Sequence, residues 1–404
     1  MSVPHTEPIR ILILLNRVPY PLNDGGAIGA FNFVKGYAEA GCNVTILAMN
    51  TSKHFVEEKK VNEVFEKYGK VETGNIDNAI KPLDALLNLF SSQSYVIQRF
   101  ISDAFRNKLI EILKKNDFDI VHVDGLPPSA YIDVIRAHSK AKISMRAHNV
   151  EHVIWERIVE EEKNLLKKLY LSIQVKRLKK YEINALSKCD VVMAISKEDE
   201  DTIKICSPST KTIVVPAGMD IDDTFKDSSN HQDLFFIGSF DWQPNLQGIE
   251  WFFENVWNDV RKNFPSLRFV IAGKKMPASI TNLKGDNVVV AGEVPDAKQF
   301  ILIHEIMIVP LVSGSGIRIK IVEAMALGKT IIATTIAAEG LGLTDGENIL
   351  IANNADEFVK HIAKCLSDIP FRKRIGENAH RFAFEHFQNK RIFEKLTAYY
   401  RQIA

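Results

Sequence analysis

The feature that most constrains the fold is a strand, a glycine-rich turn, a helix and a second strand between residues 307 and 334. Met307–Leu311 and Thr330–Thr334 are short apolar runs typical of buried strands, and Ser313-Gly-Ser-Gly316 has the composition of a turn. Between the two runs apolar residues recur at the helical period, and Gly328 stands where a helix commonly ends. The pattern predicts a βαβ unit.

The turn and the helix that follows it carry groups suited to a phosphorylated ligand. Free N–H groups at a helix start attract anions, and glycines let a phosphate come close. Arg318 and Lys320 add two cations. Glu323 lies about one helical turn beyond Lys320, where its carboxylate can accept hydrogen bonds from sugar hydroxyls. The alternative is a βαβ unit whose charges are only solvated, because a single glycine-rich turn is a weak signal.

The segment from Gly314 to Thr334, GSGIRIKIVEAMALGKTIIAT, resembles the signature of family 4 glycosyltransferases of the GT-B fold, which use nucleotide-sugar donors. In that family two glutamates eight positions apart flank the turn and helix. Glu323 matches the second glutamate, which binds the nucleotide ribose. Ser315 stands in place of the first, which helps to hold the donor sugar. The Gly-Ser-Gly-x-Arg-x-Lys pattern resembles a branch found among bacterial surface-polysaccharide enzymes.

Length and composition narrow the class of protein. A chain of 404 residues exceeds what one core usually supports, so two domains are expected. The net charge of +1 disfavours a nucleic-acid partner. The four cysteines are scattered without a C-x-x-C pair, which disfavours a metal site or a disulfide framework. No apolar signal segment or run of about eighteen apolar residues is present, so we expect a cytoplasmic protein.

The first half is predicted to be an α/β domain. Ile9–Leu15 and Asn43–Met49 resemble buried strands, and a loop with Gly25 and Gly26 and then a helix lie between them. Such a crossover places the loop at the ligand-binding edge of a parallel sheet. The absence of G-x-G-x-x-G disfavours a nicotinamide site. The family resemblance implies that the Gly25-Gly26 loop approaches the donor phosphates or the acceptor, with a plain tight turn as the alternative.

A predicted strand that ends near Ala147 puts His148 at its carboxyl end. By resemblance, His148 matches the family's histidine that contacts the donor sugar or its phosphate, and a capping role for the next helix is the alternative. His152 is expected to be a supporting or capping residue. His122, inside an earlier predicted strand, is expected to be a core residue.

Two other segments of the first half bear on possible partners. Residues 53–118 are predicted to be mostly helical. The apolar Leu83–Phe90 is expected to pack on a core or to contact an interface, with burial favoured over membrane contact. The helical region 155–184 is locally basic, and a solvated face is its simplest interpretation. Contact with anionic lipid or with a lipid-diphosphate acceptor is the alternative.

The second half is predicted to be another α/β domain. Many members of the family carry an arginine after the glycine of its first strand and a lysine a few residues later. Here Ser239 and the uncharged Asn245 or Gln247 occupy those places, so Arg318 and Lys320 are predicted to replace the missing charges. The resemblance implies a donor site made of Gly25, Gly26, Gly238, Gly273, Lys274, Gly314, Gly316, Ile317, Arg318, Lys320 and Glu323. His148, Glu323 and Ser315 are the candidate catalytic residues.

The expected architecture is therefore GT-B, with two Rossmann-like doubly wound domains facing a central cleft. Residues 1–220 would form the acceptor-side domain, 221–385 the nucleotide-sugar domain, and 386–404 a helix crossing back to the first domain. The resemblance implies a retaining, metal-independent transfer from a UDP- or GDP-linked sugar to a glycan or lipid-linked acceptor. No cofactor is expected, and peripheral contact with the inner membrane face is allowed.

Two other hypotheses remain open at this stage. The chain could be a GT-B sugar-nucleotide epimerase or a synthase that acts on a phosphate acceptor. It could also be a catalytically silent nucleotide-sugar-binding protein, because Ser315 and Ser239 depart from the family pattern.

Overall fold

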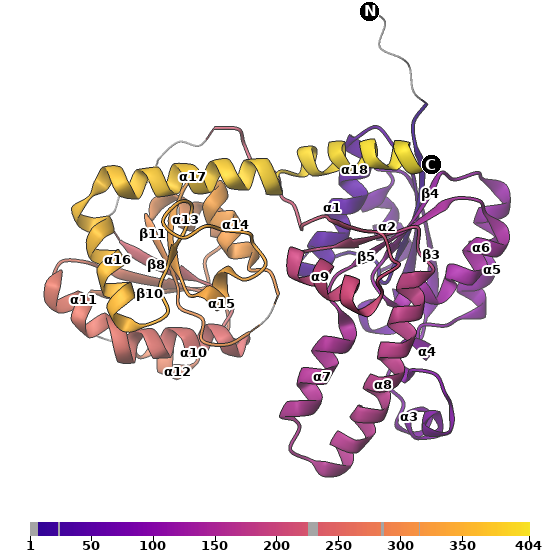
Figure 1. The fold of residues 1–404 in the computed structure, drawn as a ribbon, viewed down its shortest axis with the longest axis horizontal. Helices are drawn as coiled ribbons and strands as arrows, with labels where there is room; N and C mark the ends of the chain where they lie inside the picture. The colour runs from indigo at the N-terminus through magenta and orange to yellow at the C-terminus, as the bar shows by residue number, and fades with distance from the viewer. Residues whose placement is uncertain (1–6, 23–24, 225–232, 284–286, 315) are drawn as a thin grey trace, which may run out of the picture. The chain divides into compact units, whose positions relative to one another are not determined.

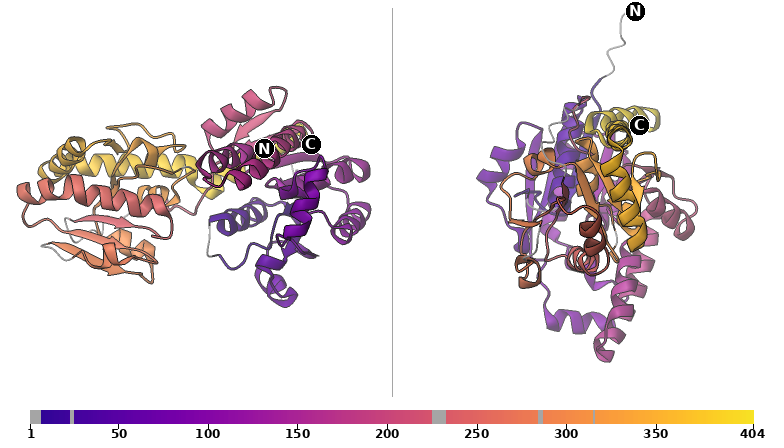
Figure 2. Two further views of the ribbon diagram at one scale, coloured as in Figure 1. Left: turned by 90° about the horizontal axis from the view of Figure 1, so that it is seen from below. Right: turned by 90° about the vertical axis from the view of Figure 1, so that its left-hand side faces the viewer.

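The computed structural model describes residues 7–22, 25–224, 233–283, 287–314 and 316–404 (Figure 1). The chain forms two compact units, which we call unit 1 (Met1–Gly218 with Asn389–Ala404) and unit 2 (Met219–Gln388). The boundaries predicted at 220 and 385 lie close to these. Residues 225–232, most of the predicted linker, lie outside the described residues. Each unit is a parallel sheet with helices on both faces (Figures 1 and 2).

Unit 1 contains a seven-stranded sheet in the order β3-β2-β1-β4-β5-β6-β7, in which all neighbouring strands pair in parallel. Its strands are β1 (Arg10–Leu15), β2 (Asn43–Thr51), β3 (Lys70–Ile76), β4 (Ile120–Asp124), β5 (Lys142–Ala147), β6 (Val191–Ala194) and β7 (Thr212–Val214). Side chains of β1 alternate between two apolar clusters, with Leu12 and Leu14 on one face and Ile11 and Ile13 on the other. The continuous apolar run of β1 is therefore explained by burial on both faces.

Helices cover both faces of this sheet and lie mostly between consecutive strands. They are α1 (Gly25–Glu39), α2 (Glu58–Phe65), α3 (Pro82–Leu87), α4 (Tyr95–Gln98), α5 (Asp103–Lys115), α6 (Ile132–His138), α7 (Glu151–Glu161), α8 (Leu165–Ser187), α9 (Lys197–Cys206) and the C-terminal α18 (Asn389–Ile403). Three short 3₁₀ turns add η1 (Ser52–His54), η2 (Asn88–Phe90) and η3 (Pro127–Tyr131). Helices α7 and α8 form a hairpin that projects from the unit, with α3 beside α8 (Figure 1).

Two sequence-based expectations for residues 53–118 are wrong. The segment contains an edge strand, β3, within the region predicted to be mostly helical. Gly74 is needed there because a Cβ would lie 2.6 Å from the Phe105 ring. The second error concerns Leu83–Phe90, where the side chains of Leu83, Leu86, Leu87 and Phe90 are 58–91% exposed.

A polar contact explains why those apolar side chains remain outside the core. The buried Asn88 side chain accepts a hydrogen bond from Gln174 Nε2 (2.8 Å), and its carbonyl oxygen accepts one from Arg177 Nη1 (2.8 Å). Arg177 Nη2 also donates to the Leu89 carbonyl (2.9 Å). The segment is thus held on α8 by hydrogen bonds, and its leucines are left in solvent.

Unit 2 contains a six-stranded parallel sheet in the order β10-β9-β8-β11-β12-β13. Its strands are β8 (Leu234–Ile237), β9 (Phe269–Ala272), β10 (Val288–Gly292), β11 (Ile306–Val309), β12 (Thr330–Ala333) and β13 (Leu350–Ile351). Its helices are α10 (Gln243–Phe252), which continues through a π turn (Phe253–Trp257) into α11 (Asn258–Asn263), then α12 (Ala278–Thr281), α13 (Ala297–Ile303), α14 (Ile319–Ala326), α15 (Thr335–Ala338), α16 (Ala355–Ser367) and α17 (Ile369–Phe387). The strand, turn, helix and strand predicted at 307–334 are therefore β11, α14 and β12 with their connecting loop.

Both sheets reverse their winding once. The order changes direction between β1 and β4 in unit 1, and between β8 and β11 in unit 2. Loops at the carboxyl ends of strands beside such a point leave a crevice where doubly wound proteins bind ligands. Each unit therefore has one topologically favoured place for a site. Within the described residues, none of the helices combines the length and hydrophobicity needed to cross a bilayer.

Helix α18 packs on α1 of unit 1 through close contact at a glycine. A Cβ at Gly36 would lie 2.1 Å from two ring atoms of Phe393, whereas nothing lies within 4 Å of a Cβ at Gly25. Tyr400 is fully buried and donates a hydrogen bond to Ser144 Oγ (2.7 Å). The C-terminal helix is thus part of the unit 1 core.

We predict that Gly36→Ala lowers the free energy of unfolding by about 1–3 kcal/mol, because the added methyl group overpacks the α1–α18 contact. Urea unfolding of the full chain measures the change. Gly25→Ala is the matched control and should change stability by about 0.5 kcal/mol or less, since its methyl group meets open space. Equal effects of the two variants would contradict the packing described.

Candidate active site

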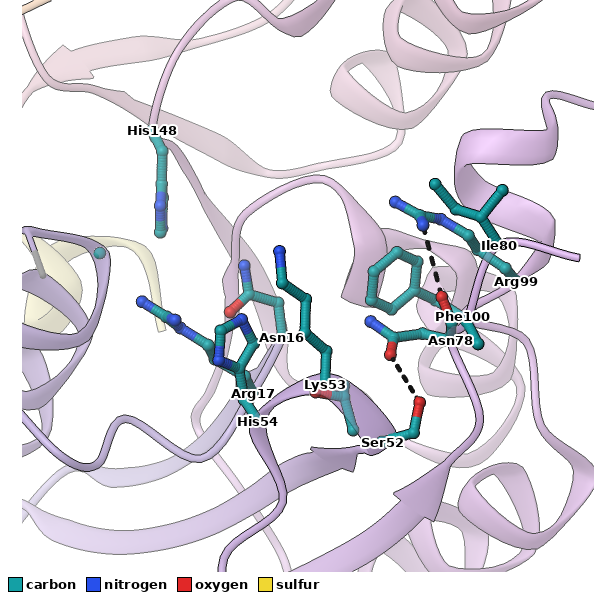
Figure 3. A pocket seen from close by; sticks show the side chains of 13 residues that line it. Asn16, Arg17, Ser52, Lys53, His54, Asn78, Ile80, Arg99, Phe100 and His148 are labelled. Atoms are coloured by element: carbon teal, nitrogen blue, oxygen red, sulfur yellow. Dashed lines mark hydrogen bonds between the residues drawn. The ribbon is translucent and has the colours of Figure 1, made fainter. Parts of the chain in front are cut away.

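A pocket of about 830 Å³ lies in unit 1 at the carboxyl edge of the sheet (Figure 3). Loops from separate strands meet there, with Asn16 and Arg17 after β1 and His148 after β5. Gly26, in the first turn of α1, also lines it, while Gly25 precedes it on the same helix. The structure therefore places Gly26 and His148, both predicted site residues, at one pocket of this unit. The remaining lining residues are Thr51, Ser52, Lys53, His54, Asn78, Ala79, Ile80, Arg99 and Phe100.

His148 is held in place by a buried carboxylate. Its Nε2 lies 2.9 Å from Oδ1 of Asp124, which is the last residue of β4. The His148 side chain remains 23% exposed. Arg146 Nη1 donates to the same oxygen (3.3 Å), and its guanidinium lies 4.2 Å from the centre of the Phe33 ring. Asp124 is fully buried, which by itself would raise its pKa. The charge and hydrogen bond of His148, with the nearby His122 ring and the charge of Arg146, instead hold the pKa of Asp124 well below its usual range.

A buried row of polar side chains extends from this carboxylate toward the C-terminal helix. His122 Nε2 lies 3.6 Å from Asp124 Oδ1, beyond hydrogen-bond distance, and His122 Nδ1 lies 2.9 Å from the Tyr37 hydroxyl. The Tyr37 hydroxyl in turn lies 3.0 Å from the Tyr400 hydroxyl. Burial lowers the pKa of His122, so we expect a neutral ring. His122 is a core residue, as the sequence predicted, but it also connects the site to α18.

The start of α7 is capped by Glu182 rather than by His148. Glu182 accepts hydrogen bonds from the backbone N–H groups of Glu151 and His152, both at 2.9 Å, and lies 2.7 Å from His152 Nδ1. The alternative of a capping role for His148 is therefore wrong, since another residue fills that role. His152 is a buried supporting residue of this cap.

The predicted donor residues of unit 2 gather at the carboxyl ends of β8, β9 and β11. Gly238 follows β8 and Gly273 follows β9, and a Cβ at Gly273 would lie 1.8 Å from the Gly238 carbonyl oxygen. A Cβ at Gly238 would lie 2.3 Å from Lys320 Nζ. Only glycine permits both approaches. The sequence separates these three residues widely, and the sheet brings them together.

Lys320 places a cation in this cluster without a paired carboxylate among the described residues. Its Nζ donates to Asn245 Oδ1 (2.9 Å) and lies 4.6 Å from the centre of the Phe236 ring. Although part of the residue remains accessible, its ammonium end lies against these groups. Burial, with the charge of Arg318 acting in the same direction, lowers the pKa of Lys320 to about 7.

Arg318 lies at the start of α14 and is only 4% exposed. Its guanidinium donates to the Gly316 carbonyl and stacks 5.1 Å from the centre of the Trp242 ring. Burial lowers its pKa. The loop before it needs glycines, because φ is +116° at Gly314 and +87° at Gly316. Arg318 therefore braces the loop in this structure.

The remaining predicted residues differ in their surroundings. Glu323 lies on α14 and is exposed. Partial burial raises the pKa of its carboxyl group, and the charge of Lys320 opposes that rise. Because the residue is exposed, water screens both effects. Lys274 is exposed and pairs with Glu293 at 3.3 Å. Ile317 packs against the apolar cluster of unit 2. Ser315 lies outside the described residues. No three His, Cys, Asp or Glu side chains gather as a metal site in the described parts of the chain.

Sequence analysis missed Asp124, Arg146, Lys53 and Arg99. Asp124 could have been found, because a carboxylate at the end of a buried apolar strand is unusual. Lys53 and Arg99 gave no such signal, since they are ordinary charged residues in a segment with no recognised motif. Only the folding of β2 and β3 beside β1 brings their loops to His148.

Comparison with known proteins covers both units. The family model described as Glycosyltransferase Family 4 matches residues 23–223, and the model described as Glycosyl transferases group 1 matches residues 231–368. A Klebsiella pneumoniae protein, an uncharacterised 44.6 kDa protein in the cps region, is 24% identical over 96% of this chain and 98% of its own length. An uncharacterised glycosyltransferase of Methanocaldococcus jannaschii is 25% identical over 52% of this chain and 59% of its own length.

Solved structures share the fold of the whole chain. The Anabaena protein HepE in complex with UDP is 15% identical and superposes with a TM-score of 0.67, covering 98% of this chain and 100% of that one. Sucrose-phosphate synthase from Thermosynechococcus elongatus is also 15% identical with a TM-score of 0.67, covering 98% and 99% of the two chains. These likenesses, with the two parallel sheets, establish the two-domain Rossmann-like GT-B fold that the sequence predicts.

We predict that Asp124→Asn lowers the free energy of unfolding by about 3–5 kcal/mol at pH 7, because it removes the carboxylate that pairs with Arg146 and His148 in the interior. Asp133→Asn is the matched control. Its carboxylate is 76% exposed and pairs with Lys188, so its loss should cost at most about 1 kcal/mol.

The pH dependence gives a second measure of the Asp124 interaction. A carboxyl whose pKa is lowered in the folded state stabilises the fold above its unfolded pKa of about 3.9, and this stabilisation is lost as the pH falls toward the folded value. The difference in unfolding free energy between wild type and Asp124→Asn should therefore shrink below about pH 4. A difference independent of pH would show that the charge of Asp124 does not stabilise the fold.

Proposed function

We propose the finer terms of the reaction of this chain, which belongs to the family 4, group 1 glycosyltransferases. Its donor is a nucleotide-sugar. It transfers a sugar with retention of anomeric configuration, without a metal ion, to a glycan or lipid-linked acceptor. Its role is in bacterial surface-polysaccharide synthesis. The relative encoded in a Klebsiella cps region supports that role. HepE, described in complex with UDP, supports UDP as the nucleotide of the donor, with GDP as the alternative.

The observation that carries the proposal is the position of the Lys320 ammonium. The places where related enzymes carry an arginine and a lysine hold Ser239 and Asn245 here. Lys320 reaches Asn245 and the backbone of Gly238 from the first turn of α14. A buried cation without a carboxylate partner among the described residues is costly to keep charged unless an anion joins it. The diphosphate of a nucleotide-sugar supplies that anion.

The other donor contacts follow from the same edge of unit 2. Backbone N–H groups of the 314–318 loop and the start of α14 would bind phosphate oxygens, with Arg318 bracing the loop. Glu323, exposed on α14, would accept hydrogen bonds from the ribose hydroxyls. Gly273 and Lys274 would lie toward the base. Ser315, in place of the family's first glutamate, leaves contacts with the donor sugar to other groups.

Unit 1 would hold the acceptor and contribute His148. The Asp124 carboxylate orients the imidazole through Nε2, so that the ring can donate to a phosphate or sugar oxygen when protonated. Retention by front-face attack needs no separate protein base, because the leaving diphosphate takes the acceptor's proton. The C–O bond to the diphosphate breaks on the same face of the sugar on which the new glycosidic bond forms. His148 would thus stabilise the departing group.

Calorimetric titration with UDP, GDP and ADP tests the donor site. One nucleotide should bind most tightly, and Glu323→Ala should weaken it by about tenfold or more, the loss expected for hydrogen bonds to a charged acceptor. Glu347→Ala, an exposed glutamate elsewhere in unit 2, is the matched control and should leave affinity unchanged. Binding of none of the three would favour the silent-protein hypothesis. Interconversion of the donor sugar without any acceptor would favour the epimerase.

The same titration at several pH values tests Lys320. Since its pKa in the free protein is about 7, the ammonium is lost as the pH rises through that value, and a phosphate must then recruit a proton to bind. Affinity should fall between about pH 6 and about pH 8.5, and Lys320→Met should remove most of that dependence. A wild-type affinity that does not change over this range would exclude Lys320 as the phosphate partner.

A further inference from the structure

The pocket of unit 1 has a chemical character that the proposed function does not explain. Three cationic side chains, Arg17, Lys53 and Arg99, line it together with His54 and His148, and no Asp or Glu is among its described lining residues. Figure 3 shows Lys53, Arg17, His54 and Asn16 extending into one part of the pocket, with His148 and Arg99 to either side. Neutral sugars are usually bound by mixed carboxylate and amide groups. Lys53 and Arg99 favour an anion, because guanidinium and ammonium groups bind phosphate oxygens well.

Each of two cations in the pocket lacks a carboxylate partner among the described residues. Lys53 extends from η1, at the end of β2, and forms no ion pair within the described part of the chain. Arg99 is half-buried and donates only to the carbonyls of Val96 (3.5 Å) and Asn78 (3.3 Å). Burial lowers its pKa, with only Tyr95 opposing. An anion in the pocket would offset that cost of burial.

Neutral hydrogen-bond donors surround these cations. The Thr51 side chain is 1% exposed, and its Oγ1 has no partner among the described residues. Asn16 and Ser52 also line the pocket. A phosphate has more acceptor oxygens than a carboxylate and can use several donors from separate loops at once.

An exposed apolar strip adjoins this pocket. Ile80 lines the pocket and is 70% exposed, and Leu83, Leu86 and Leu87 follow it on α3 at 58–74%. A second pocket of about 370 Å³ shares Ala79 and Arg99 with the first, and its lining joins Leu87 to polar residues that include Asp77 and Asp84. The apolar strip, residues 80–90, therefore begins where the cationic pocket ends. Exposed apolar patches of this kind mark interaction sites.

We propose that the pocket binds a phosphate or diphosphate group of the acceptor, and that the apolar strip takes the lipid to which this group is attached. The proposal rests on the proposed function for the place of the acceptor in unit 1. It assigns the acceptor's chemistry from Lys53, Arg99 and the strip. A soluble sugar phosphate would share the phosphate contacts without using the strip.

Titration of the full chain with inorganic diphosphate and with geranyl diphosphate tests the proposal, with UDP present at saturating concentration. Lys53→Gln and Arg99→Gln should each lower the affinity for both ligands by about tenfold. Lys114→Gln is the matched control, because Lys114 is exposed near the end of α5, which precedes β4 and so lies at the opposite edge of the sheet. It should leave both affinities unchanged.

The apolar strip separates the two sources of the phosphate. The double variant Leu83→Ser, Leu87→Ser should lower the affinity for geranyl diphosphate by about tenfold and leave the affinity for inorganic diphosphate unchanged. Its folding should be little affected, because both side chains are exposed. The leucine variant could instead bind both ligands with wild-type affinity while the Lys53 and Arg99 variants bind both more weakly. That result would assign the site to a soluble phosphate and remove the lipid part of the proposal.

Wild-type affinity for both ligands in Lys53→Gln and Arg99→Gln would overturn the proposal. Titration with UDP alone keeps this failure distinct from failure of the proposed function, because neither Lys53 nor Arg99 is among the predicted nucleotide contacts. If UDP binds and the pocket variants keep wild-type affinity for both diphosphates, the proposed transferase function stands and the acceptor is a neutral molecule.

Discussion

Parallel pairing of strands brings together, at one edge of each sheet, loops that are far apart in the sequence. In unit 1 the loops after β1, β2, β3 and β5 line one pocket, and in unit 2 the loops after β8, β9 and β11 meet around Lys320. The position where the strand order reverses keeps the neighbouring loops apart, which leaves space for a ligand. Each proposed contact depends on this polarity. A single antiparallel strand at either reversal would direct its loop to the opposite edge.

Charge is distributed differently at the two edges. In unit 1 the buried Asp124 is compensated by Arg146 and His148, so the charge is internal to the protein and fixes the histidine ring. In unit 2 Lys320 has only a neutral amide and an aromatic ring beside it among the described residues. The first arrangement stabilises a geometry, whereas the second leaves a positive charge for a ligand. This difference is why we assign positioning to Asp124 and phosphate binding to Lys320.

The sequence predicted the fold because its strands are continuous apolar runs and its turns carry glycines where the backbone needs them, as at Gly314 and Gly316. Lys320, Glu323 and His148 could be proposed as site residues because they lie within recognisable local patterns, and their roles stay predictions. It could not predict β3, since an edge strand of mixed polarity lacks the apolar run of a buried one. It also placed Leu83–Phe90 in the core, because composition cannot show that hydrogen bonds from α8 to Asn88 hold that segment outside. Lys53 and Arg99 were missed because their proximity is created only by the sheet.

The most direct test of the central claim is a crystal structure of the full chain with the nucleotide that it binds most tightly. The account predicts the diphosphate within hydrogen-bond distance of Lys320 Nζ and the N–H groups of the 314–318 loop, with the ribose hydroxyls at Glu323. A nucleotide bound in the pocket beside His148 and Lys53, with the edge of unit 2 empty, would contradict it. In that case the donor would belong to unit 1, and the division of roles between the two units would be wrong.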